Sequence, residues 1–175
     1  MLKNKKDFLR LPVVSHGAEF LVQGYLMRRN ILTYIAPPNN EGYDLICIHP
    51  NPKVKSKQLR IQVKSRYATD CNRAFPVKEK SFEAFDYLTI VFLNIGYYYK
   101  KNKSSVEGRR EIEFYTLPIS LIKKYHDKKT SWEKVSLRGL DFDLEEYKNE
   151  KGFENIAKSL DIRYPCKHNK ELIVS

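Results

Sequence analysis

The sequence predicts an α/β protein in which helices flank a mixed β-sheet, and three observations support this prediction. Residues 13–29 carry apolar side chains at helical spacing. Three apolar segments of strand length, 31–36, 43–49 and 58–65, follow and are separated by turn sequences. Residues 86–94, DYLTIVFLN, then have the β-branched and aromatic composition of a buried strand. This order of elements is typical of an α/β domain with a mixed sheet.

The first helix, at 13–29, is expected to bury one broad apolar face. That face contains Val14, Ala18, Leu21, Val22, Tyr25 and Leu26. Ser15 is the predicted N-cap, and the carboxylate of Glu19 lies near enough to the N-terminus to suit the helix dipole. Arg28 and Arg29 are basic residues of the kind that end helices.

Turn sequences separate the next three strands. The cluster PPNNEG ends the strand at 31–36, and PNP ends the strand at 43–49. The short connection that follows predicts that 43–49 and 58–65 pair as a hairpin.

The pattern is less regular beyond the third strand. We expect a short helix at 77–85, a basic loop at 97–110 and a strand at 111–117. Pro118 is suited to open a helix directly after that strand. A last helix is expected near NEKGFENIAKSL, at 149–160.

The length of 175 residues predicts a single domain over 1–175. We place its core at about 12–120 and interpret 121–175 as a C-terminal extension of the same domain.

The charge of the chain favours nucleic acid as a partner. There are 32 Lys and Arg against 21 Asp and Glu, a formal net charge of +11. Such an excess attracts nucleic acid or another anionic surface. No apolar run approaches the roughly 18 residues of a membrane-spanning helix. Cys47, Cys71 and Cys166 are scattered and form no CxxC, which argues against zinc and disulfides and for a cytoplasmic, intracellular location.

A group of polar side chains can converge where the second and third strands pair. Residues i and i+2 of a strand share a face, so Gln62 and Lys64 of LRIQVKSRY point the same way. Asp44 opens the second strand, and hairpin pairing would bring it to the same side. Glu19 lies at the rim of the apolar helix face, so its carboxylate would lie against the sheet. These four groups can therefore meet at one point.

Phosphodiester hydrolysis is the chemistry that uses such a group. Mg²⁺ takes oxygen ligands in octahedral geometry and usually keeps several waters. Asp44 would supply the central carboxylate, Gln62 an amide oxygen, and Val63 its backbone carbonyl. Glu19 would bind the metal or one of its waters. Lys64 would orient or help to deprotonate the attacking water and stabilise the developing negative charge. We expect Mg²⁺ as the cofactor, with Mn²⁺ able to substitute.

With these residues, the chain resembles the PD-(D/E)XK, or restriction-endonuclease-like, nuclease superfamily over about residues 14–94. The resemblance consists of GAEFL in the helix, GYD before a strand, QVK in the next strand and FDYLTIVF afterwards. It implies that Glu19 is the helix acid, Asp44 the motif aspartate and Lys64 the catalytic lysine, with Gln62 at the usual Asp/Glu position. It also implies an αβββαβ core and a metal-dependent DNA endonuclease.

The chain departs from the superfamily motif at two positions. Tyr43 replaces the proline of the motif name, and Gln62 replaces the second carboxylate. A neutral amide binds Mg²⁺ less strongly than a carboxylate does. A Q-x-K pattern also occurs in one group of PD-(D/E)XK homing endonucleases, which this chain resembles in that respect, and archaeal junction resolvases share the core.

Other interpretations of the same residues stay open. Asp44 could close a turn after NNEGY, and Gln62 and Lys64 could form the solvated face of a strand. An endonuclease of this kind would be a homing, restriction or junction-resolving enzyme. The alternative is a catalytically inactive nucleic-acid-binding domain of the same fold, and a protein-interaction domain is a third possibility.

DNA is the expected partner. Cutting both strands of a duplex with one site per chain requires two chains, so we expect a homodimer or a higher homo-oligomer. Membrane association is not expected. The candidate nucleic-acid-binding residues, which follow the proposed site along the chain, are Arg66, Tyr67, Arg73 and Lys78.

Overall fold

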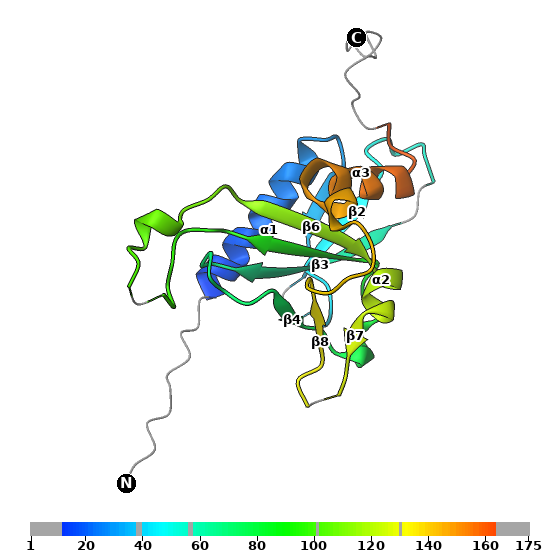
Figure 1. The fold of residues 1–175 in the computed structure, drawn as a ribbon. Helices are drawn as coiled ribbons and strands as arrows, with labels where there is room; N and C mark the ends of the chain where they lie inside the picture. Colours follow the sequence, from blue (N-terminus) through cyan, green and yellow to red (C-terminus); the bar gives the residue numbers. More distant parts are fainter. Residues whose placement is uncertain (1–11, 38–39, 56–57, 101, 130, 164–175) are drawn as a thin grey trace.

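A computed structural model describes residues 12–37, 40–55, 58–100, 102–129 and 131–163 (Figure 1). Within these ranges the chain forms a central five-stranded sheet and a smaller three-stranded sheet. Cys166 lies outside the described residues.

The central sheet is mixed and has the strand order β1-β2-β3-β5-β6. Its strands are β1 (Leu32–Ile35), β2 (Leu45–Ile48), β3 (Leu59–Arg66), β5 (Tyr87–Phe92) and β6 (Glu113–Pro118). The first three strands pair in antiparallel fashion, β3 and β5 are parallel, and β5 and β6 are antiparallel. The five predicted strands and the predicted fold class, a mixed sheet flanked by helices, are confirmed.

Helix α1 (Pro12–Met27) covers one face of this sheet. Ala18, Val22 and Leu26 are fully buried and pack in one cluster with the inward side chains of β2 and β3. The predicted N-cap at Ser15 is wrong, because the helix begins three residues earlier, at Pro12. Proline has no N–H and a fixed φ, so it suits the first helical turn.

Helix α3 (Asn149–Ser159) packs on the same face as α1 (Figure 1). Phe153 and Ile156 of α3 share the buried cluster of α1, and the rings of Tyr25 and Phe153 stack at 6.1 Å. A 3-10 turn, η3 (Leu144–Tyr147), precedes the helix. The C-terminal part of the chain therefore contributes to the main core.

The opposite face of the sheet carries a second buried cluster. It is covered by the small sheet of β4 (Ala74–Pro76), β8 (Lys134–Ser136) and β7 (His126–Asp127), and by α2 (Ile119–Lys124). Phe75 and Val135 of this small sheet pack against Leu88 and Ile90 of β5. The helix opened by Pro118 is thus confirmed, while the small sheet was not predicted.

The short helix predicted at 77–85 is not formed as an α-helix. The chain instead crosses from β3 to β5 through β4 and a single 3-10 turn, η1 (Glu79–Ser81). The N–H of Val77 donates to the carbonyl of Glu133 at 3.2 Å. This bond continues the strand-like pairing of β4 and keeps the start of the segment extended.

A long connection between β5 and β6 projects from the sheet, and we call residues 95–110 the arm (Figure 1). It corresponds to the predicted basic loop and contains one 3-10 turn, η2 (Val106–Gly108). Gly96 has φ +143°, and a Cβ there would lie 2.2 Å from the carbonyl oxygen of Ser105. The two sides of the arm therefore approach so closely at its base that only glycine fits.

None of the helices in the described ranges combines the length and the apolar composition needed to cross a lipid bilayer.

Candidate functional site

Asp44 is fixed at the open end of the β2–β3 hairpin, opposite the turn, by three hydrogen bonds. Its main-chain N–H donates to Ile61 and its carbonyl accepts from Ala36, both at 2.8 Å. Its side-chain Oδ2 accepts the main-chain N–H of Val63 at 2.6 Å. The carboxylate thus takes the place of a main-chain carbonyl beside β3, just before β2 begins, and its position is set by the backbone.

The backbone carbonyl of Val63 faces the same side of β3 as Asp44. The N–H and C=O of one strand residue point in the same direction, and the N–H of Val63 meets Asp44. Arg66 is three residues further along β3, so its backbone groups point to the opposite edge of the strand. Its carbonyl accepts the main-chain N–H of Leu93, on the β5 side. The predicted backbone ligand therefore lies where it could share a cation with Asp44.

Gln62 is buried, with 8% of its surface exposed. Its side-chain Oε1 has no hydrogen-bond partner among the described residues. A buried polar atom without a partner costs about 1–3 kcal/mol, so native proteins rarely keep one without a ligand, water or ion to satisfy it. An amide oxygen is also one of the ligands that Mg²⁺ accepts.

Gln62 and Lys64 share one face of β3, as predicted. In the parallel register they align with Leu88 and Ile90 of β5, which belong to the cluster on the face opposite α1. Lys64 is half-buried, and its ammonium forms no hydrogen bond or salt bridge within the part of the chain that the structure describes. It is therefore available to a substrate.

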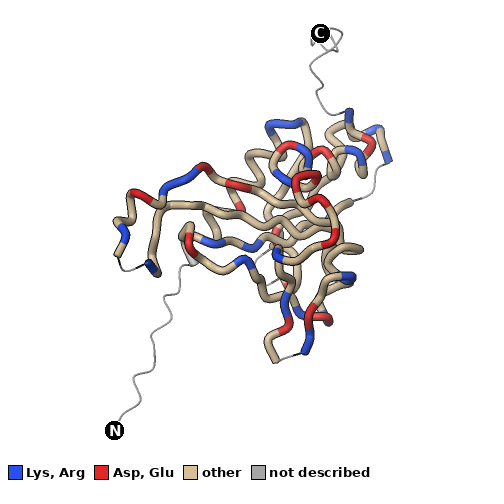
Figure 2. Tube along the Cα trace, viewed as in Figure 1, with Lys and Arg blue, Asp and Glu red and all other residues tan. Residues whose placement is uncertain are grey.

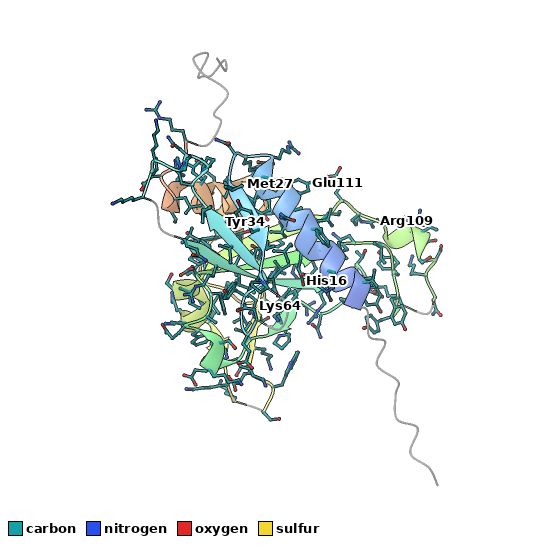
Figure 3. All side chains as sticks on the ribbon, turned by 180° about the vertical axis from the view of Figure 1, so that it is seen from behind. His16, Met27, Tyr34, Lys64, Arg109 and Glu111 are labelled. Carbon is teal, nitrogen blue, oxygen red and sulfur yellow. The ribbon has the colours of Figure 1, made fainter. Side chains whose placement is uncertain are left out.

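Glu19 approaches from α1, on the other face. Its side chain is 15% exposed, and its Oε2 lies 2.9 Å from Nδ1 of His16. Burial and the negative charge of Asp44 raise the pKa of Glu19, while His16 and Lys64 act in the opposite direction. Figure 3 labels His16 in the N-terminal half of α1 and Lys64 near it in that view. The four predicted residues therefore do not share one face, but Glu19 is close enough to Asp44 and Lys64 to feel their charges.

The donor set fits a hard cation. Two carboxylates, one amide oxygen and one backbone carbonyl are all oxygen ligands, which Mg²⁺ and Mn²⁺ prefer. Burial is the larger cause of the raised pKa of Glu19, and the second cause, repulsion from Asp44, is one that a bound cation would relieve. The described residues contain no group of three His, Cys, Asp and Glu side chains arranged to hold a metal. Any metal here would therefore depend on Gln62 and Val63 as well as on the acids.

Two clefts lie beyond the carboxyl end of β3, and neither is lined by the four candidate residues. The first, which we call the adjacent cleft, has a volume of about 520 Å³. It includes Ser65, which follows Lys64 in β3, and Ser15, one helical turn before Glu19. The second, the basic cleft, has a volume of about 630 Å³ and lies across the loop that contains Asp70. Arg66, which lies on the same face of β3 as Gln62 and Lys64, also lines the adjacent cleft, so this cleft lies at the end of β3 that carries Lys64.

Two of the candidate nucleic-acid-binding residues have roles within the fold. Arg66 donates to the carbonyl of Ala74, lies 4.5 Å from the centre of the Phe75 ring, and has its pKa lowered by burial. Tyr67 packs edge-to-face against Tyr98 at 5.3 Å. Burial, and then Tyr99, raise the pKa of its hydroxyl. Both residues line the adjacent cleft, so they shape it as well as support the loop.

The other two candidates lie further along the chain. Lys78 is exposed, next to η1. Arg73 is half-buried and lines the basic cleft.

His16 is a site residue that the sequence reasoning missed. It lies three residues before Glu19, and this spacing places two side chains on the same face of a helix. The HxxE spacing in the sequence could have revealed the pair.

Comparison with protein-family models finds no match, and comparison with curated protein sequences finds none either. Two solved structures are similar in fold. A bacterial homing endonuclease, I-Ssp6803I, aligns over 83% of this chain and 92% of its own, with 14% identity and a TM-score of 0.49. Hjc, a Holliday junction resolvase of Archaeoglobus fulgidus, aligns over 87% of this chain and 99% of its own, with 8% identity and a TM-score of 0.42. At these levels of similarity, function has to be inferred from the side chains of the site.

Proposed function

We propose that the protein is a metal-dependent DNA endonuclease of the PD-(D/E)XK, restriction-endonuclease-like type. The observation that carries this proposal is the buried Oε1 of Gln62. It lacks a hydrogen-bond partner among the described residues, and its strand neighbour Val63 binds the carboxylate of Asp44. A cation bound by both side chains would satisfy the amide and neutralise the carboxylate.

The residues divide the work of phosphodiester hydrolysis. Asp44, Gln62 and the carbonyl of Val63 would hold a Mg²⁺ ion, which supplies Lewis-acid stabilisation of the phosphate charge when bound. Glu19 would hold the ion or one of its waters, and His16 keeps its carboxylate in place. Lys64 would position the attacking water and balance negative charge that develops on the phosphate.

The positive charge of the chain supports nucleic acid as the substrate. A net charge of +11 favours binding to the phosphate backbone. A homing, a restriction and a junction-resolving enzyme would differ in whether they prefer a long target, a short symmetric site or a four-way junction. Each chain supplies one site, so cutting a duplex through both strands requires a homodimer or a higher homo-oligomer. Light scattering in solution would then give at least twice the mass of one chain.

A second candidate function is supported by the same residue. Gln62 is a neutral amide and binds Mg²⁺ more weakly than a carboxylate. A domain that binds DNA without cutting it would keep the fold and lose the chemistry. Salt-sensitive DNA binding without nicking under any metal would distinguish it from the nuclease.

Lys64→Ala tests the nuclease proposal. The variant is expected to cut DNA about 10²–10⁴-fold more slowly than the wild type, because it loses a group that acts on the transition state. DNA binding measured in chelator should be retained. Lys53→Ala is the matched control, because Lys53 is an exposed lysine in the turn at the far end of β2. Undiminished cutting by Lys64→Ala, or an equal loss in Lys53→Ala, would contradict the role of Lys64.

A further inference from the structure

The basic cleft lies at the carboxyl end of β5 and is bordered by the arm, the loop around Asp70 and the start of α3. It contains five basic side chains: Arg73, Lys100, Arg110, Arg138 and Lys148. Figure 2 shows basic positions recurring along the arm. Lys100 and Arg110 of the arm line the cleft. Residues far apart in the sequence therefore bring positive charge to one hollow.

Arg73 packs against two aromatic rings within the cleft. Its guanidinium lies 4.4 Å from the centre of the Phe92 ring and 5.3 Å from that of Tyr115. Both rings are 3% exposed and belong to neighbouring strands. The two rings lie at 88° to each other, and the guanidinium packs against both without using its N–H donors.

No carboxylate neutralises Arg73 within the described residues, because none of their ion pairs or hydrogen bonds involves its guanidinium. A half-buried arginine normally has an anionic or hydrogen-bonding partner, since partial burial weakens its contact with water. Arg66 meets this need through the carbonyl of Ala74. The guanidinium of Arg73 packs against two aromatic rings, and its N–H donors have no partner among the described residues, so it can bind an anionic ligand.

Three acids line the cleft against its five basic side chains; Asp70 and Glu113 have partners, whereas the Glu111 carboxylate forms no ion pair among the described residues. Asp70 accepts the main-chain N–H groups of Tyr98, Tyr99 and Lys100 at 2.7–3.0 Å. Glu113 pairs with Lys148 at 3.0 Å. The basic side chains that have no carboxylate partner among the described residues are Arg73, Lys100, Arg110 and Arg138. Positive charge therefore remains in excess inside the cleft.

An aromatic side chain lines the same hollow. Tyr97 is half-buried at the base of the arm, and Nζ of Lys100 lies 4.6 Å from its ring centre. Basic groups beside an accessible aromatic ring are typical of sites that bind a nucleic-acid strand, because phosphates meet the charges and a base can stack on the ring.

The basic cleft and the adjacent cleft share the loop around Asp70. Asp70 and Cys71 line both the basic cleft and the adjacent cleft, so the two hollows lie on either side of one short loop. Arg66, which shares the Lys64 face of β3, lines the adjacent cleft. A strand whose phosphate lay at Lys64 could therefore pass through the adjacent cleft and reach Arg73.

We propose that the basic cleft binds phosphodiester groups of the nucleic-acid strand beyond the cut, with Arg73 as its central contact. This inference rests on the proposed function only in taking nucleic acid as the ligand. It requires no metal and no cleavage.

The test is the salt dependence of binding to a fluorescent DNA duplex in chelator. One lost phosphate contact reduces the slope of log K against log salt by about 0.9. Arg73→Gln should therefore bind about eightfold more weakly near 0.1 M salt and almost equally near 1 M. Arg28→Gln is the matched control. Arg28 is also an arginine over a tyrosine ring, 5.7 Å from the centre of Tyr25, but it lies outside both clefts.

Arg138→Gln is a second variant that keeps the test valid if Arg73→Gln does not fold. Arg138 is exposed, so its loss cannot disturb the packing around Phe92, and it should reduce the slope as Arg73→Gln does. If neither variant weakens binding more than Arg28→Gln, or if the wild type does not bind DNA, the inference is wrong. If inorganic phosphate binds and Arg73→Gln abolishes that binding while DNA affinity is unchanged, the cleft takes a free anion and not a strand. If the wild type binds DNA and the two variants weaken binding as expected, but no cleavage is seen with any metal, the nuclease proposal is wrong. The assignment of the basic cleft as a phosphodiester-binding site would still hold.

Discussion

Replacing Gln62 with methionine should make the protein more stable and inactive. The Oε1 atom of Gln62 is buried without a hydrogen-bond partner among the described residues. Removing such an atom relieves a penalty of about 1–2 kcal/mol. Methionine is similar in length and flexibility, so the replacement adds little packing strain. For a chain of this size, the melting temperature in chelator should rise by about 2–8 °C.

Metal should reverse the order of stability. A ligand at a hundred times its dissociation constant stabilises the folded state by about 2.7 kcal/mol. If Gln62 is a metal ligand as proposed, the wild type should gain this from Mg²⁺ and Gln62→Met should gain much less. The assay is thermal unfolding of both proteins, in chelator and in a series of Mg²⁺ concentrations.

Two results would refute this reasoning. A less stable Gln62→Met in chelator would mean that the amide is satisfied within the fold. An equal gain from Mg²⁺ in both proteins would mean that Gln62 is not a metal ligand. Either result would remove the observation on which the proposed function rests.

Two further predictions concern the site and the arm. Gln62→Glu should bind Mg²⁺ more tightly than the wild type in calorimetric titration, because a third carboxylate joins Asp44 and Glu19; unchanged affinity would place residue 62 outside the metal shell. Burial raises the pKa of Asp70, but three N–H groups at 98–100 outweigh it and leave this pKa below its ordinary value. The stability that Asp70 contributes is therefore present above about pH 4 and lost as the pH falls through the lowered value. Asp70→Asn should accordingly speed hydrogen exchange at 98–100 at neutral pH, and equal rates in both proteins would show that the carboxylate does not hold the arm.

The central sheet could be predicted because its strands are apolar and long enough to show a pattern. The segment 86–94 has six consecutive buried residues as β5, and the polar face of β3 was visible in the spacing of Gln62 and Lys64. The small sheet could not be predicted in this way. Its strands have two or three residues each, too few for an alternating pattern, and they form because Phe75 and Val135 pack against β5.

The candidate site was predictable in its residue types but not in its geometry. A spacing cannot show that Asp44 binds the N–H of Val63 or that Glu19 approaches from the opposite face of the sheet. These positions depend on where β2 ends and on how α1 crosses it. Arg73 was predicted only as one of four candidate nucleic-acid-binding residues that follow the site along the chain. Its support by Phe92 and Tyr115 joins residues that are distant in the sequence.

The most direct test is the nicking of supercoiled plasmid, linear duplex and four-way junction by the wild type and Asp44→Asn, with Mg²⁺, Mn²⁺ or chelator. Asparagine can still accept the N–H of Val63, so the variant should keep the hairpin and lose only the charge. The account predicts metal-dependent cutting by the wild type that falls about a hundredfold or more in the variant. Cutting that is equal in both proteins, or that persists in chelator, would contradict it.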